Sequence, residues 1–310
     1  MTDARWVNAD GLATVRADGT TLDAWFPQVH AGRRPATTDL TALQPHAGVD
    51  ERREVSLEVI SIETDLDAPV SSTADAYLRL HALSLLLVRP NEVNLEGIFG
   101  HLPNVAWTTA GPMHPDDVTA RRPALVRAGI QVQGLDKFPR LTDYVLPDGV
   151  RIADASRVRL GAHLSPGTTI MHEGFVNFNA GTLGAVMVEG RLSQGVVVQG
   201  GTDIGAGAST MGTLSGGGTQ RVSVGARSLI GANAGIGIAI GDDCVVEAGL
   251  YVTAGTKVTT TDDAGEAVVV KAAVLSGVNG LLFLRNSQTG AVEARRRSGV
   301  GVTLNDALHA

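Results

Sequence analysis

The stretch Ser223–Val258 reads SVGARSLIGANAGIGIAIGDDCVVEAGLYVTAGTKV and places an aliphatic residue at almost every sixth position. With a single four-residue step after the third member, this series contains Val224, Ile230, Ile236, Ile240, Val246, Val252 and Val258. An earlier series keeps the same period and contains Ile152, Val158, Leu164, Ile170, Val176, Thr182 and Val188. A helix repeats every 3.6 residues and a strand every 2, so neither explains a period of six. The pattern is an internal repeat.

A coil with three flat sides accounts for this period. Each side is a short strand of about six residues, and equivalent residues stack roughly 4.8 Å apart as an inward aliphatic ladder. A second inward position, four residues after each ladder residue, has to be small, and Cys244 falls there. We therefore interpret Cys244 as a packing residue and not as a reactive thiol. Glycine directly after the ladder residue suits a tight backbone, as at Gly225, Gly231, Gly237 and Gly241.

Composition agrees with a core of small aliphatic residues. The 310-residue chain has 38 glycines, 44% hydrophobic residues and only 4% aromatic residues. Its formal net charge is −7 and it has no long basic block, so a nucleic-acid partner is not expected. The single cysteine cannot form an internal disulfide, and no apolar run could span a bilayer. The sequence predicts a soluble, cytoplasmic protein with no membrane partner.

The repeat divides the chain into three predicted parts. Residues 1–145 read as an α/β domain, with a strand at Val55–Glu63 and a helix at Ser72–Val88. The coil is expected over residues 146–260, after a turn at Leu146–Gly149. Residues 261–310 are expected to leave the coil and to cap its end.

Two segments outside the regular repeat receive their own predictions. Thr210–Arg221 is glycine-rich and lacks the ladder, so we expect a projecting loop there, where solenoids often carry binding surfaces. In the cap, Leu281–Leu284 and Ala291–Ala294 are expected to pair as a hairpin, and Leu304–His309 is expected to form a short helix.

The array resembles the left-handed parallel β-helix of hexapeptide-repeat acyltransferases. MHEGFVNFNAGTLGAVMVEGRLSQGVVVQGGTDIGAG followed by ASTMGTLSGGGT is similar to the actinobacterial type of tetrahydrodipicolinate N-succinyltransferase. The resemblance is specific from about residue 151 to residue 287. It implies a mainly β protein that transfers a succinyl group from succinyl-CoA to the amino group of ring-opened tetrahydrodipicolinate. It also implies a homotrimer with active sites between neighbouring coils.

The resemblance implies a role for three residues near the chemical step. The family places its catalytic glutamate in the motif MVEGRL, which here is Glu189, acting as a general base or through a transient acyl anhydride. The Gly212 backbone N–H is the implied oxyanion donor. Arg191 could pair with a carboxylate of substrate or cofactor, although an arginine with no such task fits the spacing equally well.

Coenzyme A is implied to lie in a groove between two coils. Lys271 and Arg285 suit its anionic phosphates, and we expect the four-residue step at Ile236–Ile240 to shift the ladder beside this groove. The remaining implied contacts are Ser209, Ala232, Glu247, Ala248, Gly255, Asn286 and Ser287.

Other interpretations remain open. His163 and His172 could be ligands of a zinc site like that of the carbonic-anhydrase-like β-helices, but the sequence has no third histidine within the coil. Glu173 could bind a structural Mg²⁺ near a threefold axis, as the resemblance suggests, or be a plain surface carboxylate. A different acyltransferase using acetyl-CoA and a non-catalytic assembly module are the rival functions.

Overall fold

The computed structural model describes residues 5–35, 39–213, 220–262 and 264–297. The helix expected at Leu304–His309 lies outside these residues. The chain forms two compact units: unit 1 comprises residues 1–88 and 92–145, and unit 2 comprises residues 89–91 and 146–310. Among the described residues, no helix has the length and apolar character needed to cross a bilayer.

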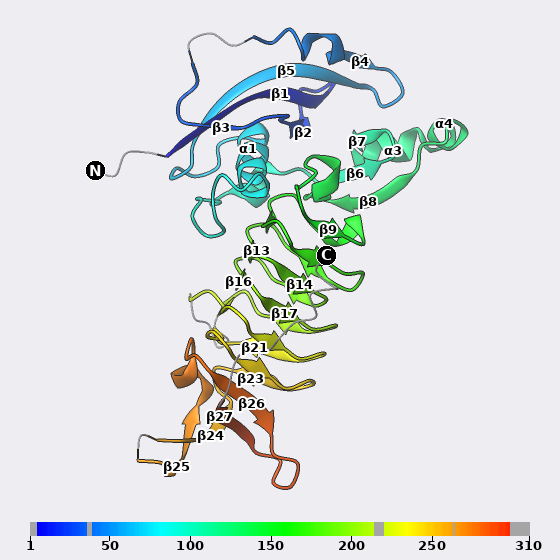
Figure 1. Ribbon diagram of the computed structural model, residues 1–310. Coiled ribbons are helices and arrows are strands. Elements are labelled where there is room, and N and C mark those ends of the chain that lie inside the picture. The colour runs from blue at the N-terminus through cyan, green and yellow to red at the C-terminus, as the bar shows by residue number, and fades with distance from the viewer. Residues whose placement is uncertain (1–4, 36–38, 214–219, 263, 298–310) are drawn as a thin grey trace. The chain divides into compact units, whose positions relative to one another are not determined.

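Unit 1 contains an antiparallel sheet ordered β2-β1-β5-β4, with β3 paired to β1 (Figure 1). Helix α1 (Thr73–Ser84) packs on β1, β2 and β5. The strands are β1 Trp6–Arg16, β2 Thr21–Trp25, β3 His30–Ala31, β4 Gly48–Asp50 and β5 Val55–Asp65, with a 3₁₀ helix at Gln44–His46.

Both elements predicted in unit 1 exist, with different ends. β5 runs two residues past the expected end. The Ser72 side chain accepts a hydrogen bond from the Asp75 backbone N–H and so caps α1 at its expected start. The helix ends at Ser84, four residues before the predicted Val88, because Leu86 adopts a left-handed backbone conformation with φ 62°.

A second, three-stranded antiparallel sheet completes unit 1 in the order β7-β6-β8. Short helices between β7 and β8 contribute Val118 and Leu125 to a core shared with Ala106, Met113 and Ile130. The elements are α2 Ile98–His101, β6 Val105–Thr108, β7 Gly111–Met113, α3 Pro115–Ala120, α4 Arg122–Arg127, β8 Val132–Asp136 and a 3₁₀ helix at Leu141–Asp143.

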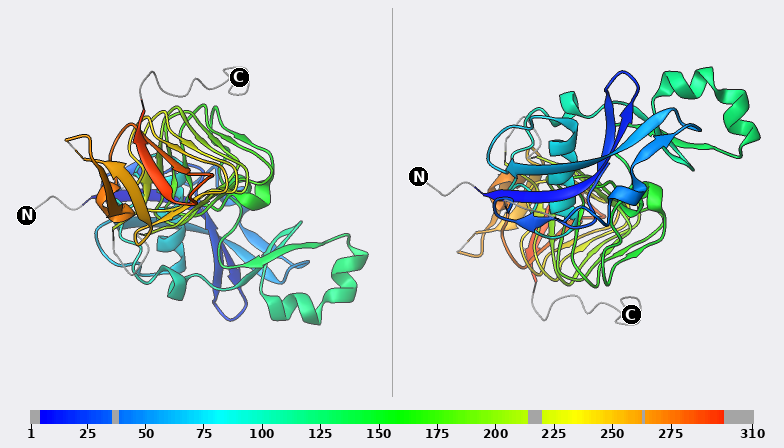
Figure 2. Two further views of the ribbon diagram at one scale, coloured as in Figure 1. Left: turned by 90° about the horizontal axis from the view of Figure 1, so that it is seen from below. Right: turned by 90° about the horizontal axis from the view of Figure 1, so that it is seen from above.

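Unit 2 is a parallel β-helix with three faces, as the six-residue period predicts. Face A contains β9 Arg151–Ile152, β11 Thr169–Ile170, β14 Val186–Val188, β17 Thr202–Ile204, β20 Leu229–Ile230, β22 Val245–Val246 and β26 Leu281–Arg285. Face B contains β12 Phe175–Val176, β15 Arg191–Leu192, β18 Ser209–Thr210, β21 Gly235–Gly237 and β23 Tyr251–Thr253. Face C contains β10 His163–Leu164, β13 Gly181–Leu183, β16 Val197–Gln199 and β19 Ser223–Val224. In Figure 2 the successive rungs of the coil overlap.

The predicted ladder residues pair with one another across the rungs. On face A, Ile170 lies beside Ile152 on one side and Val188 on the other, all in parallel register. From Val158 to Val258 the ladder side chains are almost completely buried. Removing these side chains from water supplies the hydrophobic stabilisation of the coil, although the chain has few aromatic residues.

The coil is continuous between the two sequence series. Four further ladder residues, all fully buried, fill this gap: Leu192, Val198, Ile204 and Thr210. They escaped the sequence pattern because Val188 to Leu192 is a second four-residue step, which shifts the phase of the repeat. The predicted loop leaves the coil after Thr210, and its described ends pair as an antiparallel bridge between Thr213 and Arg221.

The C-terminal hairpin exists, but its first strand returns to the coil. β26 pairs antiparallel with β27 (Val292–Arg296), as predicted. β26 also pairs in parallel with β22, and Phe283 occupies the buried ladder position beside Val246. The segment that leaves the coil after Val258 is therefore an excursion, built from β24 Lys257–Thr261, β25 Ala267–Lys271 and a 3₁₀ helix at Ala272–Leu275.

Candidate active site

One column of the coil contains Glu189 and Glu247, two of the three glutamates that the sequence singled out. The residue that follows each face A ladder residue donates its backbone N–H to the ladder carbonyl of the next rung, at 2.8–2.9 Å. Residues related in this way occupy equivalent corner positions. We call four consecutive members of this column the corner strip: Glu189, Gly205, Gly231 and Glu247.

The two central members of the corner strip have to be glycine. A Cβ atom on Gly205 would lie 2.7 Å from the Ala232 backbone nitrogen, and one on Gly231 would lie 2.5 Å from that of Ala248. Neither glycine has a positive φ, so the requirement is close backbone approach. The strip therefore has no side chain between the Glu189 and Glu247 carboxylates, and the small side chains of Ala232 and Ala248 flank it.

Glu189 and Arg191 lie on the shortened corner between β14 and β15. Only three residues separate the ladder residues Val188 and Leu192 there. The middle residue is Gly190, where a Cβ atom would lie 2.5 Å from the Ala208 carbonyl oxygen. The half-buried Glu189 and the exposed Arg191 therefore lie on either side of Gly190 in one tight turn.

Ser209 is in contact with this corner. It pairs with Arg191 across β15 and β18, and its hydroxyl accepts a 2.5 Å hydrogen bond from the Arg191 guanidinium. The exposed arginine side chain is thereby held along face B. The structure thus brings together two residues that the sequence predicted separately.

Gly212 lies at the start of the projecting loop, two residues after the ladder residue Thr210. Its carbonyl accepts a hydrogen bond from the Val222 N–H at 3.3 Å. Its own N–H has no hydrogen-bond acceptor among the described residues. An unpaired backbone N–H is the type of donor that an oxyanion site needs.

The other end of the corner strip meets the hairpin turn. A Glu247 carboxylate oxygen accepts a hydrogen bond from the Arg285 backbone N–H at 2.7 Å. The Asn286 side chain organises the turn by accepting from the N–H groups of Gln288 and Thr289 and donating to Glu293. The arginine side chain and Ser287 remain exposed. Glu247 and the hairpin turn that begins at Arg285, 38 residues later in the sequence, therefore form one cluster.

Lys271 and Gly255 belong to the excursion beyond β23 and not to the corner strip. Lys271 is exposed and lies opposite Lys257 across β24 and β25. Lys257 was not predicted as a site residue, since only the strand register reveals that the two lysines share one face of this strand pair. Gly255 is exposed and a Cβ atom there would meet nothing within 4 Å.

The candidate metal ligands do not converge within one chain. His163 is buried in β10, whereas His172 and Glu173 are exposed in the turn after Ile170. In the part of the chain that the structure describes, no group of three His, Cys, Asp or Glu side chains could hold a metal ion. Cys244 is buried, and burial raises the pKa of its thiol, which agrees with a packing role.

The chain is similar to known proteins over its whole length. Residues 221–254 match a model described as the hexapeptide repeat of succinyl-transferase, and residues 102–140 match one described as the middle part of tetrahydrodipicolinate N-succinyltransferase. A 2,3,4,5-tetrahydropyridine-2,6-dicarboxylate N-succinyltransferase of Salinispora tropica is 58% identical over 100% of this chain and 99% of its own length. The chain belongs to the tetrahydrodipicolinate N-succinyltransferase family.

Further family members agree. A protein of the same name from Pseudomonas aeruginosa is 58% identical over 79% of this chain and 72% of its own length. A crystal structure of a Campylobacter jejuni protein described as a putative 2,3,4,5-tetrahydropyridine-2-carboxylate N-succinyltransferase superimposes with a TM-score of 0.80 at 30% identity. That likeness covers 94% of this chain and 92% of the other. In this family member, the sequence analysis missed Gly205 and Gly231 as site residues, although glycine directly after a ladder residue was the available signal.

Proposed function

We propose that this family member transfers a succinyl group from succinyl-CoA to the amino group of hydrated, ring-opened tetrahydrodipicolinate. The product is N-succinyl-2-amino-6-oxopimelate, in lysine and diaminopimelate biosynthesis. The observation that carries this proposal is the 58% identity to a succinyltransferase over the whole chain. A cytoplasmic location belongs to the same proposal, because an acyl-CoA is an intracellular cosubstrate.

The reaction needs a base beside the thioester. The substrate nitrogen forms a bond to the thioester carbonyl carbon, the carbon–sulfur bond breaks, and sulfur leaves as the coenzyme thiol. The amine loses a proton in this step, and we assign its removal to Glu189. The half-buried carboxylate at the end of a side-chain-free strip supports this role, because its backbone is held by the coil and its side chain is accessible.

The corner strip supports a binding path for the pantetheine arm. Four rungs separate Glu189 from β26, which is about 19 Å at roughly 4.8 Å per rung. Along this length the strip exposes backbone and small side chains, and at its far end lies Arg285. We propose that the thioester lies at Glu189 and that the anionic phosphates lie toward the hairpin turn.

Two further groups have proposed roles at the chemical end. The Gly212 N–H would stabilise the tetrahedral oxyanion, and its lack of an acceptor among the described residues supports this. Arg191 would bind a substrate carboxylate, with Ser209 holding its guanidinium in place.

Assembly into a homotrimer is part of the proposal. A Mg²⁺ ion prefers six oxygen ligands, and one exposed Glu173 supplies at most two. Three symmetry-related Glu173 carboxylates with water fit such an ion, which would neutralise like charges at the axis and take no part in acyl transfer.

The test is thiol release from succinyl-CoA with the cyclic dicarboxylate as acceptor. Glu189→Gln should lower the rate at least 100-fold, because general-base catalysis contributes about 10² to 10⁴. The matched control is Glu266→Gln, an exposed glutamate outside the site. Retained activity in Glu189→Gln would remove Glu189 from its role, and absence of thiol release by the wild type would contradict the function.

The same assay separates the open alternatives. Without acceptor, an acyl anhydride at Glu189 would release one thiol per site in a burst, whereas a general base would release none. Equal rates with acetyl-CoA would favour the acetyl-transferring alternative.

A further inference from the structure

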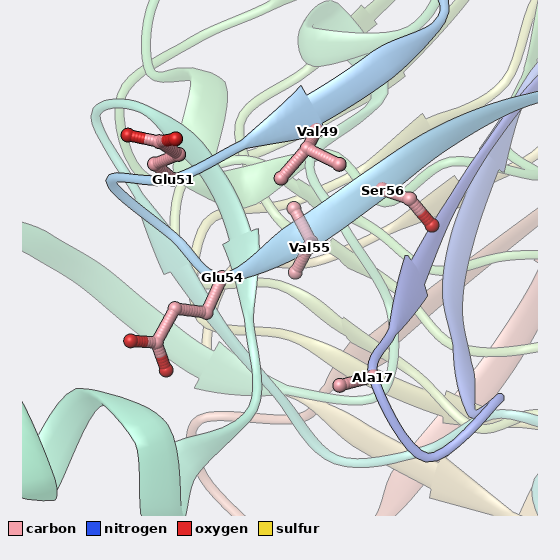
Figure 3. A pocket seen from close by; sticks show the side chains of 6 residues that line it. All are labelled: Ala17, Val49, Glu51, Glu54, Val55 and Ser56. Carbon is pink, nitrogen blue, oxygen red and sulfur yellow. The ribbon is translucent and has the colours of Figure 1, made fainter.

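Two of the hollows in unit 1 are similar in size and differ in chemistry. One, of about 400 Å³, lies beside β4 and β5, and in Figure 3 the Glu51 and Glu54 carboxylates extend away from its central valines, Val49 and Val55. The other, of about 390 Å³, lies between β2 and the sheet β7-β6-β8. The second is lined by a buried carboxylate and by a guanidinium, and the inference concerns this second hollow.

The base of the second hollow contains a buried carboxyl group. Asp23 is 6% exposed, and one of its oxygens accepts a 2.5 Å hydrogen bond from the Tyr144 hydroxyl. Its other oxygen, Oδ1, is shielded from solvent and has no hydrogen bond of good geometry among the described residues, although Thr14 lies opposite Asp23 across the two strands and interacts with its carboxyl group. A buried oxygen without a partner costs free energy, so the site favours a ligand that can donate to it.

A second buried hydroxyl lies near Asp23. The Tyr77 hydroxyl has no hydrogen bond of good geometry among the described residues, and the Tyr77 ring lies 5.7 Å from that of Tyr144. Burial raises the pKa of the Asp23 carboxyl more than Thr14, Tyr144 and the nearby Arg53 together lower it. A cation entering the hollow would therefore stabilise the ionised form of Asp23.

Two indole rings form the walls. Trp25 and Trp107 line the hollow, and both indole N–H groups are already bonded to backbone carbonyls, of Tyr144 and Asp136 respectively. Trp25 is 36% exposed and can offer apolar contact and attraction to a cation, whereas Trp107 is 8% exposed and packs against Tyr144.

The rim combines the Arg140 guanidinium with the Asp143 carboxylate. Arg140 uses Nε and Nη2 to bind Asp143 and Nη2 to bind the Gln133 side-chain oxygen. Its Nη1 group and the Gln133 amide nitrogen have no partner among the described residues. A carboxylate at the rim would satisfy both.

We propose that this hollow binds a zwitterionic aliphatic amino acid, with its ammonium group at Asp23 and its carboxylate at Arg140. The acceptor at the base and the donors at the rim match the two charges, and the indole walls match an aliphatic side chain. The volume lies within the range of small-molecule sites. The inference stands on unit 1 alone and is independent of the proposed acyl transfer.

The experiment uses three matched probes on the full-length protein: L-norleucine, pentylamine, which lacks its carboxylate, and hexanoate, which lacks its ammonium group. Two of the three tryptophans line the hollow, so saturable binding should change tryptophan fluorescence. We expect L-norleucine to bind best, pentylamine about tenfold more weakly, and hexanoate not to bind. Equal binding of hexanoate and L-norleucine would overturn the proposal.

Variants locate the site and keep the test independent of folding. Asp23→Asn should weaken L-norleucine binding at least tenfold, whereas Asp116→Asn, an exposed aspartate of α3, should leave it unchanged. Arg140→Gln should reduce L-norleucine binding to the level of pentylamine, which serves as the second readout if Asp23→Asn fails to fold. Unchanged binding in Arg140→Gln or in folded Asp23→Asn would contradict the proposal. Lost binding in Arg191→Gln would place the probe in the coil and would also contradict it.

Discussion

At the residue scale, the corners of the coil use two backbone devices. Three residues after many ladder residues, the chain adopts a left-handed conformation, as at Arg227, Asn233 and Asp243 with φ of 55–56°. Directly after many ladder residues, the chain instead requires glycine because a Cβ atom would collide with the next rung, although the φ is not positive, as at Gly231. The first device only turns the chain, whereas the second creates the side-chain-free corner strip, so substitution at the two positions should have different consequences.

Gly231→Ala tests the second device. Its Cβ atom would lie 2.5 Å from the Ala248 nitrogen, so we expect a loss of about 1–3 kcal/mol in the free energy of unfolding, typical of overpacking. We also expect weaker coenzyme A binding, seen as less protection against thermal unfolding.

Gly255→Ala is the matched control for stability. A Cβ atom there meets nothing within 4 Å and the φ is not positive, so its free energy of unfolding should stay level or rise by about 0.4–1 kcal/mol. Equal stability of the two variants would show that the rungs can separate locally at Gly231.

At the element scale, α1 is a helix buried from Asp75 onward and organised by polar groups. Arg79 is 1% exposed, pairs with Asp75 at 2.7 Å and donates to several backbone carbonyls around the helix. His81 is fully buried, and its Nδ1 lies 2.7 Å from the Tyr77 carbonyl oxygen. Burial disfavours the charged imidazolium and lowers the pKa of His81 to about 4.

The depressed pKa of His81 predicts acid sensitivity. An unfolded histidine has a pKa near 6.5, so between pH 6.5 and about 4 the unfolded chain binds more protons than the folded one. The contribution of His81 to the free energy of unfolding is therefore fully present above pH 6.5. It is lost as the pH falls to 4, and the total loss is about 3 kcal/mol. Urea unfolding at pH 7 and pH 5 should show this fall.

The variant His81→Gln isolates this effect. It removes the titrating group, so its stability should decrease less between pH 7 and pH 5 than that of the wild type, whatever its stability at pH 7. His46→Gln replaces an exposed histidine and should keep the wild-type slope. Identical slopes for all three proteins would exclude His81 as the source.

At the scale of the whole molecule, the coil completes its own core but not the proposed metal site. Ladder residues from Ile170 to Phe283 pair along face A and are buried within one chain. Glu173, in contrast, is exposed and has no companion ligands among the described residues. The proposed ion therefore depends on assembly.

The expected assembly has three times the 32.1 kDa mass of the chain. Light scattering after size-exclusion chromatography should give this mass at micromolar concentration, and Glu173→Gln should lower the concentration-dependent stability of the assembly. A fully active species with the mass of a single chain would contradict the homotrimer.

The sequence by itself determined the repeat and hence the coil, because stacked ladder residues must recur with a fixed period wherever the rungs are regular. It could not reveal the four ladder residues from Leu192 to Thr210, since the four-residue step after Val188 changes the phase of the six-residue repeat. The step from Ile236 to Ile240 crosses from face B to face C, at another corner than the corner strip. The step after Val188 carries Glu189 and Arg191.

Only the tertiary structure decided which distant residues share the site. The contact of Glu247 with Arg285 depends on β26 returning to face A after a 37-residue interval, and hydrophobic period does not encode such a return. The unsatisfied Asp23 oxygen was equally hidden, because satisfaction of a hydrogen bond depends on neighbours from β1, α1 and residue 144. The period of the hydrophobic residues can be read from the sequence. The residues that each corner contacts, and the hydrogen-bond partners of each polar atom, depend on how the rungs and sheets pack.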